Sequence, residues 1–295
     1  MARKAFLSYC AEEVRRNDRD RFLTALFAPT HLREHLYTLY AFNIEISKTR
    51  EVVNETMLGA IRLQWWREAI EANYQKTPVR EHAVVTALKS TINNCNLDRD
   101  NFERLIDGRN LDLEDVPPTN LLDLLEYADA TSGSIVLLAL QVLGVNINSE
   151  IRRIALEVGR AWAIVGTIRA MPYQLRRGRF MLPDELVENF GVERRGVLDL
   201  KSSSELAAAI GVVSAEAKKH LVSARSNRRG IPRTAIAALL PAVLAEIYLH
   251  PLRRAQNNFF DQRLAETPGI ATIRLTAASI FACSFLWTSS GLSLI

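Results

Sequence analysis

The segment 169–179 reads Arg-Ala-Met-Pro-Tyr-Gln-Leu-Arg-Arg-Gly-Arg and is rich in arginine. The planar guanidinium group of arginine fits phosphate oxygens, so this segment could bind an anion. A helix that holds Mg²⁺-diphosphate needs carboxylates one turn apart, whereas this segment contains no Asp or Glu, and Ala170 and Gln174 are two of its positions one turn apart. The residues therefore favour anion binding without a metal, although spacing alone is more typical of a solvated helix end.

A second candidate lies upstream, where Glu45 and Glu51 stand six residues apart. Two carboxylates that share Mg²⁺ should be three or four residues apart on a helix, so these two fall on different faces. Lys48 and Arg50 add positive charge to the same turns and would repel a divalent cation. We expect no metal site here, and we interpret the acidic residues at 112–115 as a solvated helix end.

Other chemistry-bearing residues favour packing over catalysis. His31 and His35 are four apart but lack the context of a zinc motif. The small residues within 127–136 permit close helix approach first and could form a ligand wall second. Tryptophans at apolar helix positions are more often core than part of a cofactor site. No glycine-rich phosphate loop or nucleophile elbow is present, and basic residues are not interleaved with aromatics, so we expect no nucleic-acid partner.

Apolar residues recur at helical spacing nearly throughout the chain, without sustained strand alternation. Proline, serine, threonine and aspartate provide the start and stop signals. The predicted helical runs cover residues 30–44, 54–70, 79–94, 102–106, 119–143, 149–172, 202–226, 234–260 and 270–287. Pro172 should interrupt or end one helix, and Pro241 and Pro251 should kink or divide another. With 178–200 as the longest irregular piece, the sequence predicts one all-α domain over residues 1–295.

Composition limits the functional classes. Lys and Arg number 37 against 33 Asp and Glu, which gives a net charge of +4 and mildly favours anionic partners, or an inert basic surface. Three scattered cysteines suit a reduced, cytoplasmic compartment and no zinc site. The basic N-terminus lacks the apolar core of a signal peptide. Residues 268–295 are expected to form a C-terminal helix of uncertain docking, packed on the core or lying on a membrane surface.

Several segments together resemble the squalene/phytoene synthase superfamily across roughly residues 5–260. The matching landmarks are 39–42 (Leu-Tyr-Ala-Phe), 63–66 (Leu-Gln-Trp-Trp), Gly108 with Asp112, Tyr127 with Gly133, and 176–183 (Arg-Arg-Gly-Arg-Phe-Met-Leu-Pro). The last is the most specific. The resemblance implies an all-α isoprenoid synthase fold. It also implies an enzyme that joins two prenyl diphosphates head to head, with Mg²⁺ held by two Asp-rich motifs.

The chain departs from this pattern at the positions that carry the family's chemistry. The acid positions hold Ser47, Lys48 and Glu51 in the first motif and Ala170 and Gln174 in the second, with Gly166 in place of a metal-side asparagine. Ala130 replaces an aromatic that lines the reaction pocket. The resemblance retains Arg169 and Arg179 as candidate anion- or diphosphate-binding residues. One surviving acid, Glu51, cannot hold a trinuclear Mg²⁺ cluster that would stabilise a diphosphate leaving group.

A narrower resemblance is to the complex I assembly factor 6 branch of this superfamily, carried by residues 41–46, 61–66 and 169–173. It implies a bacterial-type relative that is non-catalytic, needs no cofactor, and binds complex I subunits or assembly intermediates, with a prenyl lipid or prenyl diphosphate as a further ligand. It also implies a cytoplasmic protein, peripheral at the inner face of the cytoplasmic membrane. The alternative is an active prenyltransferase that requires Mg²⁺. Docking of helix 270–287 on anionic lipid is a third hypothesis.

Overall fold

The computed structural model describes residues 7–53, 55–78, 81–226, 231–261, 264 and 274–277, and this part of the chain is helical without strands. Its larger helices are α1 (Tyr9–Asn17), α2 (Arg19–Ala25), α3 (Thr30–Ser47), α5 (Thr56–Gln75), α6 (Ala83–Cys95), α7 (Arg99–Leu111), α8 (Leu121–Ala128), α9 (Ser134–Val142), α10 (Ser149–Leu175), α13 (Ser204–Ser226) and α15 (Pro241–Arg254). Short helices are α4 (Thr49–Val52), α11 (Asp184–Asn189), α12 (Arg194–Leu198) and α14 (Ile236–Leu239). The predicted all-α fold is confirmed.

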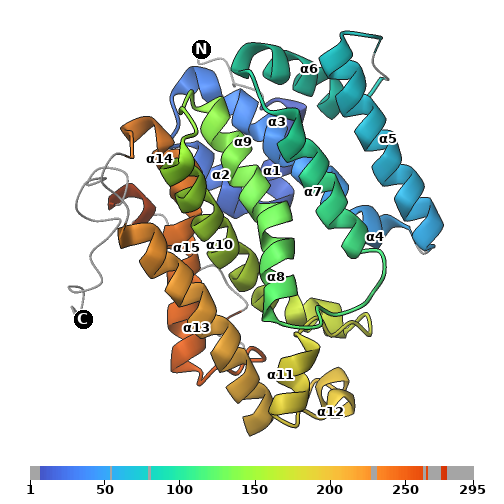
Figure 1. Ribbon diagram of the computed structural model, residues 1–295, viewed down its shortest axis with the longest axis vertical. Coiled ribbons are helices and arrows are strands. Elements are labelled where there is room, and N and C mark those ends of the chain that lie inside the picture. Colours follow the sequence, from blue (N-terminus) through green and yellow to red (C-terminus); the bar gives the residue numbers. More distant parts are fainter. Residues whose placement is uncertain are drawn as a thin grey trace, which may run out of the picture.

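Helices α3, α9 and α10 form the centre of the molecule, with α5, α6 and α7 on one side and α13 and α15 on the other (Figure 1). Helix α3 is buried almost continuously from residue 36 to residue 44, and α9 from residue 134 to residue 140. Such helices are apolar on most faces because they are surrounded by other helices. Helix α10 has an apolar stripe that packs on α13 and α15 and an opposite face toward α8 and α9.

Helix starts follow the predicted capping chemistry with small shifts. The carboxylate of Asp98 accepts a hydrogen bond from the backbone N–H of Asp100 and caps the start of α7. Helix α10 is capped by the side chain of Asn148 instead of Ser149. The predicted helix from residue 79 begins at Ala83, after His82. These differences are local because neighbouring polar residues compete for the same cap position.

Several predicted boundaries differ from the structure. The run 119–143 is divided by a π-helical segment, Asp129–Gly133. The run 234–260 is divided at Pro241, which begins α15, as one of the two predicted outcomes for this proline. Pro251 lies within α15, and α10 continues past Pro172 to residue 175. The predicted irregular piece 178–200 contains α11 and α12. Helices this short have too few residues for a periodic pattern.

The π-helical segment is packed unusually tightly on α10. A Cβ built on Gly159 would lie 2.6 Å from both the Cα and the N of Gly133, so backbone meets backbone at this crossing. Only glycines allow this approach, which confirms the packing interpretation of the small residues at 127–136. The side chains of Ala130 and Thr131 in this segment lie against Gly108 of α7, where an added Cβ would meet them at 3.0 and 2.9 Å.

The predicted C-terminal helix within residues 268–295 lies largely outside the described residues. Residues 274–277 are helical, and Leu275 within them is fully buried. Within the described residues no single helix has the length and apolar composition to cross a membrane, whereas the bent pair Arg233–Leu239 and Pro241–Arg254 meets that test together.

Candidate functional site

A cavity of about 800 Å³ opens between the ends of α3, α7, α8 and α10. Its apolar wall comes from Leu124 and Ala130 on the α8 side and from Trp162, Ala163 and Met171 on α10. Its volume lies within the range of ligand pockets in proteins. The π-helical segment contributes to this wall, so residues 130–132 line the cavity as well as contacting neighbouring helices.

Both segments singled out in the sequence reach this cavity. Gly166, Ala170 and Gln174 lie one turn apart along α10 and line it, and Ser47 and Glu51 line it from the ends of α3 and α4. A Cβ on Gly166 would meet no atom within 4 Å, so this position opens directly on the cavity space. Lys48 turns away, and its Nζ pairs with the carboxylate of Glu13 at 2.6 Å.

Arg179 reaches the same cavity but its guanidinium group is already occupied. It pairs with the carboxylate of Asp115 at 2.6 Å and donates to the side chain of Gln174 at 3.2 Å and to the carbonyl of Asp112 at 3.1 Å. Arg50, on α4, pairs with the same Asp115 carboxylate. The hydrogen bond from Arg50 and the charge of Arg179 hold the pKa of Asp115 below its usual range. Asp115 thus joins two lining arginines that are distant in the chain.

A second ion pair, between two residues that line the large cavity, joins Arg109 and Asp112. Arg109 pairs with Asp112 at 3.1 Å and donates to the hydroxyl of Tyr127 at 2.9 Å and to the side-chain oxygen of Asn43 at 3.3 Å. The Tyr127 hydroxyl in turn donates to Asp112 at 2.9 Å. Burial raises the pKa of Tyr127, so it stays a neutral donor. A fourth lining arginine, Arg21, pairs with Asp18 at 2.7 Å.

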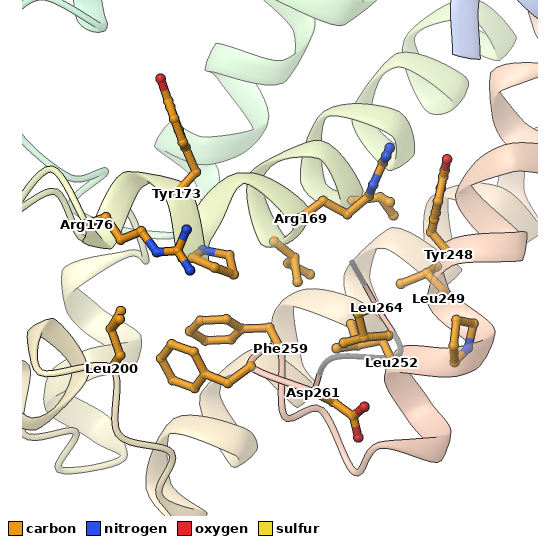
Figure 2. Close-up of a pocket in the computed structure, with 15 residues that line it drawn as sticks. Arg169, Tyr173, Arg176, Leu200, Tyr248, Leu249, Leu252, Phe259, Asp261 and Leu264 are labelled. Carbon is orange, nitrogen blue, oxygen red and sulfur yellow. The ribbon is translucent and has the colours of Figure 1, made fainter. Parts of the chain in front are cut away.

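Arg169 lies on another face of α10, at a separate cavity of about 380 Å³ formed with α15. Its guanidinium group stacks on the ring of Tyr248, 3.6 Å from the ring centre, and pairs with the buried carboxylate of Asp20 at 3.0 Å. The Tyr248 hydroxyl donates to that carboxylate as well. Figure 2 shows the polar ends of Arg169 and Tyr248 pointing together away from Phe259. Arg169 and Arg179 are therefore not brought to one site.

The carboxylates at the large cavity do not form a cation site. Six acids line it, namely Glu51, Asp107, Asp112, Glu114, Asp123 and Glu126. Within the described residues no three histidine, cysteine or acidic side chains are placed to hold a metal ion together. Two of these acids have partners of their own, because Asp107 pairs with Arg67 at 2.7 Å and Asp123 accepts a hydrogen bond from the backbone N–H of Thr119. Asp129 does not line the cavity and pairs with Arg160. The donor set does not fit the Mg²⁺ cluster that the family resemblance would require.

Sequence reasoning missed the residues that neutralise the arginines. Asp20 and Asp115 lie far from their partners in the chain, and no local spacing links them. The position of Arg169 on a different face from Ala170 could have been predicted from the sequence, because consecutive helical residues point about 100° apart. Gly166, Ala170 and Gln174 share one helix face, and Arg169 does not lie on that face.

Comparison with known proteins agrees with this architecture. A family model described as squalene/phytoene synthase matches residues 14–269. The mouse protein "NADH dehydrogenase (ubiquinone) complex I, assembly factor 6" (Mus musculus) is 30% identical over 258 residues, which cover 88% of this chain and 77% of the relative. The human relative with the same description (Homo sapiens) is 28% identical with the same coverage. A presqualene diphosphate synthase from Rhodopseudomonas palustris is 24% identical and covers 75% of this chain and 77% of the relative.

Two solved structures share the fold. A dehydrosqualene synthase superposes with a TM-score of 0.80 at 20% identity, over 92% of this chain and 94% of the other. Squalene synthase HpnC from Alicyclobacillus acidocaldarius has a TM-score of 0.74 at 22% identity, over 84% and 92% of the two chains. At this level of identity the structures establish the fold alone.

Proposed function

The chain belongs to the squalene/phytoene synthase family, and from this premise we propose that it is a non-catalytic factor that assists the assembly of a respiratory NADH dehydrogenase. Relatives described as complex I assembly factors, at up to 30% identity, support the assembly role. The proposed partners are complex I subunits or assembly intermediates. We further propose that the protein works in the cytoplasm, at the inner face of the cytoplasmic membrane.

The non-catalytic role rests on one observation, the α10 wall of the large cavity. Ionisation of a prenyl diphosphate needs cations that stabilise the charge on the departing diphosphate. The positions one turn apart on this wall are Gly166, Ala170 and Gln174, none of which carries a charge. Across the cavity, Ser47 donates its hydroxyl to the carbonyl of Ile44, and Glu51 is the acid of that segment. No cofactor is part of the proposed role.

The assembly role can be tested by deleting the gene in the cell that encodes it. We expect the amount of assembled NADH dehydrogenase on native gels, and the NADH:quinone reductase rate of the membranes, to fall together, and the wild-type gene to restore both. Unchanged assembly in the deletion strain would refute the role. A preserved amount of assembled complex with a reduced rate would also contradict it.

A matched pair of variants connects assembly with the cavity. Phenylalanine at Gly166 would enter the open cavity without a backbone clash, whereas alanine at the same position leaves almost all of the cavity open. We expect Gly166→Ala to complement the deletion and Gly166→Phe to fail, with both variants folded by circular dichroism. Equal complementation by both would show that the cavity is not needed for assembly.

The second candidate function is prenyl transfer with Mg²⁺, which the presqualene diphosphate synthase relatives and the retained cavity favour. Incubation with farnesyl diphosphate and Mg²⁺ separates the two functions. We expect no pyrophosphate release above that of the protein-free control. Rapid Mg²⁺-dependent release, with a head-to-head condensation product, would establish the transferase and end the non-catalytic proposal.

A further inference from the structure

The arginines around the large cavity share one property, which is that each already has a carboxylate partner within the chain. Arg21 pairs with Asp18, Arg109 with Asp112, and Arg50 and Arg179 share Asp115. Arg169, which the family resemblance would place at a diphosphate, pairs with Asp20. A diphosphate entering the cavity would have to compete with these intramolecular carboxylates for the same donors.

The balance of charge in the cavity also opposes an anion. Its described lining contains six acids and four arginines. Glu51, Glu114 and Glu126 are exposed, and no ion pair to a described cation is found for them, so the excess charge at the rim is negative. A diphosphate bound there would lie close to like charges, which disfavours its binding. Mg²⁺ would not relieve this repulsion in the way the family's enzymes use it, because the acids do not converge.

The interior, by contrast, suits an apolar chain. Leu124, Ala130, Trp162, Ala163 and Met171 provide much of the inner wall, and the cavity of about 800 Å³ is large enough for a lipid tail. Gly166 and Ala170 widen it on the α10 side because they lack long side chains. Burying hydrocarbon against such a wall stabilises a complex without any charged contact.

We infer that the cavity binds an uncharged isoprenoid-type lipid and discriminates against prenyl diphosphates, with Asp115 acting as the intramolecular counter-anion of two arginines that line it, Arg50 and Arg179. This inference rests on the proposed function, since it names the ligand class of the non-catalytic cavity. Asp115 is suited to this position because one carboxylate reaches both Arg50 and Arg179. One carboxylate balances one of the two positive charges and engages donors of both arginines, so a diphosphate would have to displace it to reach them.

The test compares farnesol with farnesyl thiodiphosphate, a slowly hydrolysed analogue with the same tail, by calorimetric titration of the full chain. With EDTA present, we expect farnesol to bind about tenfold or more tightly than the thiodiphosphate, because the latter brings charge to an acidic rim. Mg²⁺ should not reverse this order. Equal or tighter binding of the thiodiphosphate, with or without Mg²⁺, would overturn the inference, and so would the absence of farnesol binding.

A variant pair isolates the role of the internal counter-anion. Asp115→Asn removes the charge that holds Arg50 and Arg179 while keeping a residue that tolerates the left-handed backbone found there (φ 54°). Glu126→Gln removes the same charge from the rim but frees no arginine. We expect Asp115→Asn to raise thiodiphosphate affinity several-fold with farnesol affinity unchanged, and Glu126→Gln to raise it less. An equal rise in both variants would refute a specific role for Asp115.

The outcomes separate this inference from the proposed function. Preference for the thiodiphosphate, without pyrophosphate release from farnesyl diphosphate and with assembly still dependent on the gene, would overturn the ligand class alone. Farnesol preference combined with normal assembly in the deletion strain would overturn the assembly role alone. Mg²⁺-dependent turnover would overturn both.

Discussion

Replacing Gly159 and Gly166 by alanine, one at a time, should change stability in opposite directions. The two glycines are seven residues apart in α10 and therefore lie on nearly the same face of the helix. Gly166 faces open cavity space, whereas Gly159 is pressed against the backbone of Gly133. The helix propensity gained by each substitution is the same, so the difference between the two variants reports the packing alone.

The magnitudes follow from these environments. At Gly166, alanine should stabilise the protein by about 0.5–1 kcal/mol, because glycine loses more conformational freedom in a helix and nothing opposes the new methyl group. At Gly159 the same gain is opposed by a methyl group 2.6 Å from the Cα and N of Gly133. Overpacking of this kind costs about 1–3 kcal/mol, and backbone atoms cannot rotate away as a side chain could. We expect a net loss of about 1–2 kcal/mol.

Urea denaturation followed by circular dichroism measures both effects, and unchanged slopes would show that the midpoints report stability. Gly166→Ala should move the midpoint up and Gly159→Ala should move it down. If both variants shift the midpoint equally, the close approach of α10 to the π-helical segment is wrong. A stabilised Gly159→Ala would lead to the same conclusion.

Three further predictions concern buried polar groups. Tyr248→Phe removes the hydroxyl that donates to Asp20 and should cost about 1.5–3 kcal/mol by urea denaturation; a cost equal to that of the exposed control Tyr173→Phe would contradict the buried contact. Burial alone would raise the pKa of Glu157, but the hydrogen bond from His220 and nearby positive charges lower the pKa below its ordinary value of about 4.5. The ionised carboxylate therefore stabilises the fold at pH values above about 4.5. This contribution is lost as the pH falls through the lower pKa of the folded state. The stability difference between wild type and Glu157→Gln should therefore shrink from neutral pH to acid, and a difference that grows on acidification would refute the sign. Burial raises the pKa of Cys10 to about 11, so iodoacetamide near neutral pH should alkylate it in urea but not in the native protein, as peptide masses would show; native labelling at the denatured rate would contradict its burial.

The sequence was most informative where a periodic pattern reflects tertiary burial. Helices α3 and α10 were predicted because their apolar residues recur on faces that are in fact surrounded by other helices. The π-helical segment was not predicted, since one extra residue in a turn leaves no mark on an already apolar and small-residue stretch. The break at Pro241 was predicted as a kink or division, and the structure makes it a division.

The candidate site was likewise predicted only in part. Resemblance predicted two facing segments, and Ser47, Glu51, Gly166, Ala170 and Gln174 do line one cavity. The pairing of Asp20 with Arg169, and of Asp115 with two arginines, could not be predicted. These contacts join residues that are distant in the chain, and any other acidic residue would have been an equal candidate. Only the tertiary fold shows which acids pair with these arginines.

The backbone at Asp115 connects this charge arrangement with the fold. Its φ of 54° lies in the left-handed region, which costs a non-glycine residue roughly 1–2 kcal/mol, although aspartate tolerates it better than most. A glycine at this position would remove the strain, but it would also leave Arg50 and Arg179 without their shared carboxylate. The side chains of Arg50 and Arg179 are 23% and 13% exposed and that of Asp115 is 36% exposed, so these ion pairs are partly solvated. Exposed pairs of this kind contribute about 0–1 kcal/mol, which does not exceed the strain. On the proposal made above, the aspartate at this position is therefore explained by its charge at the cavity and not by a gain in stability.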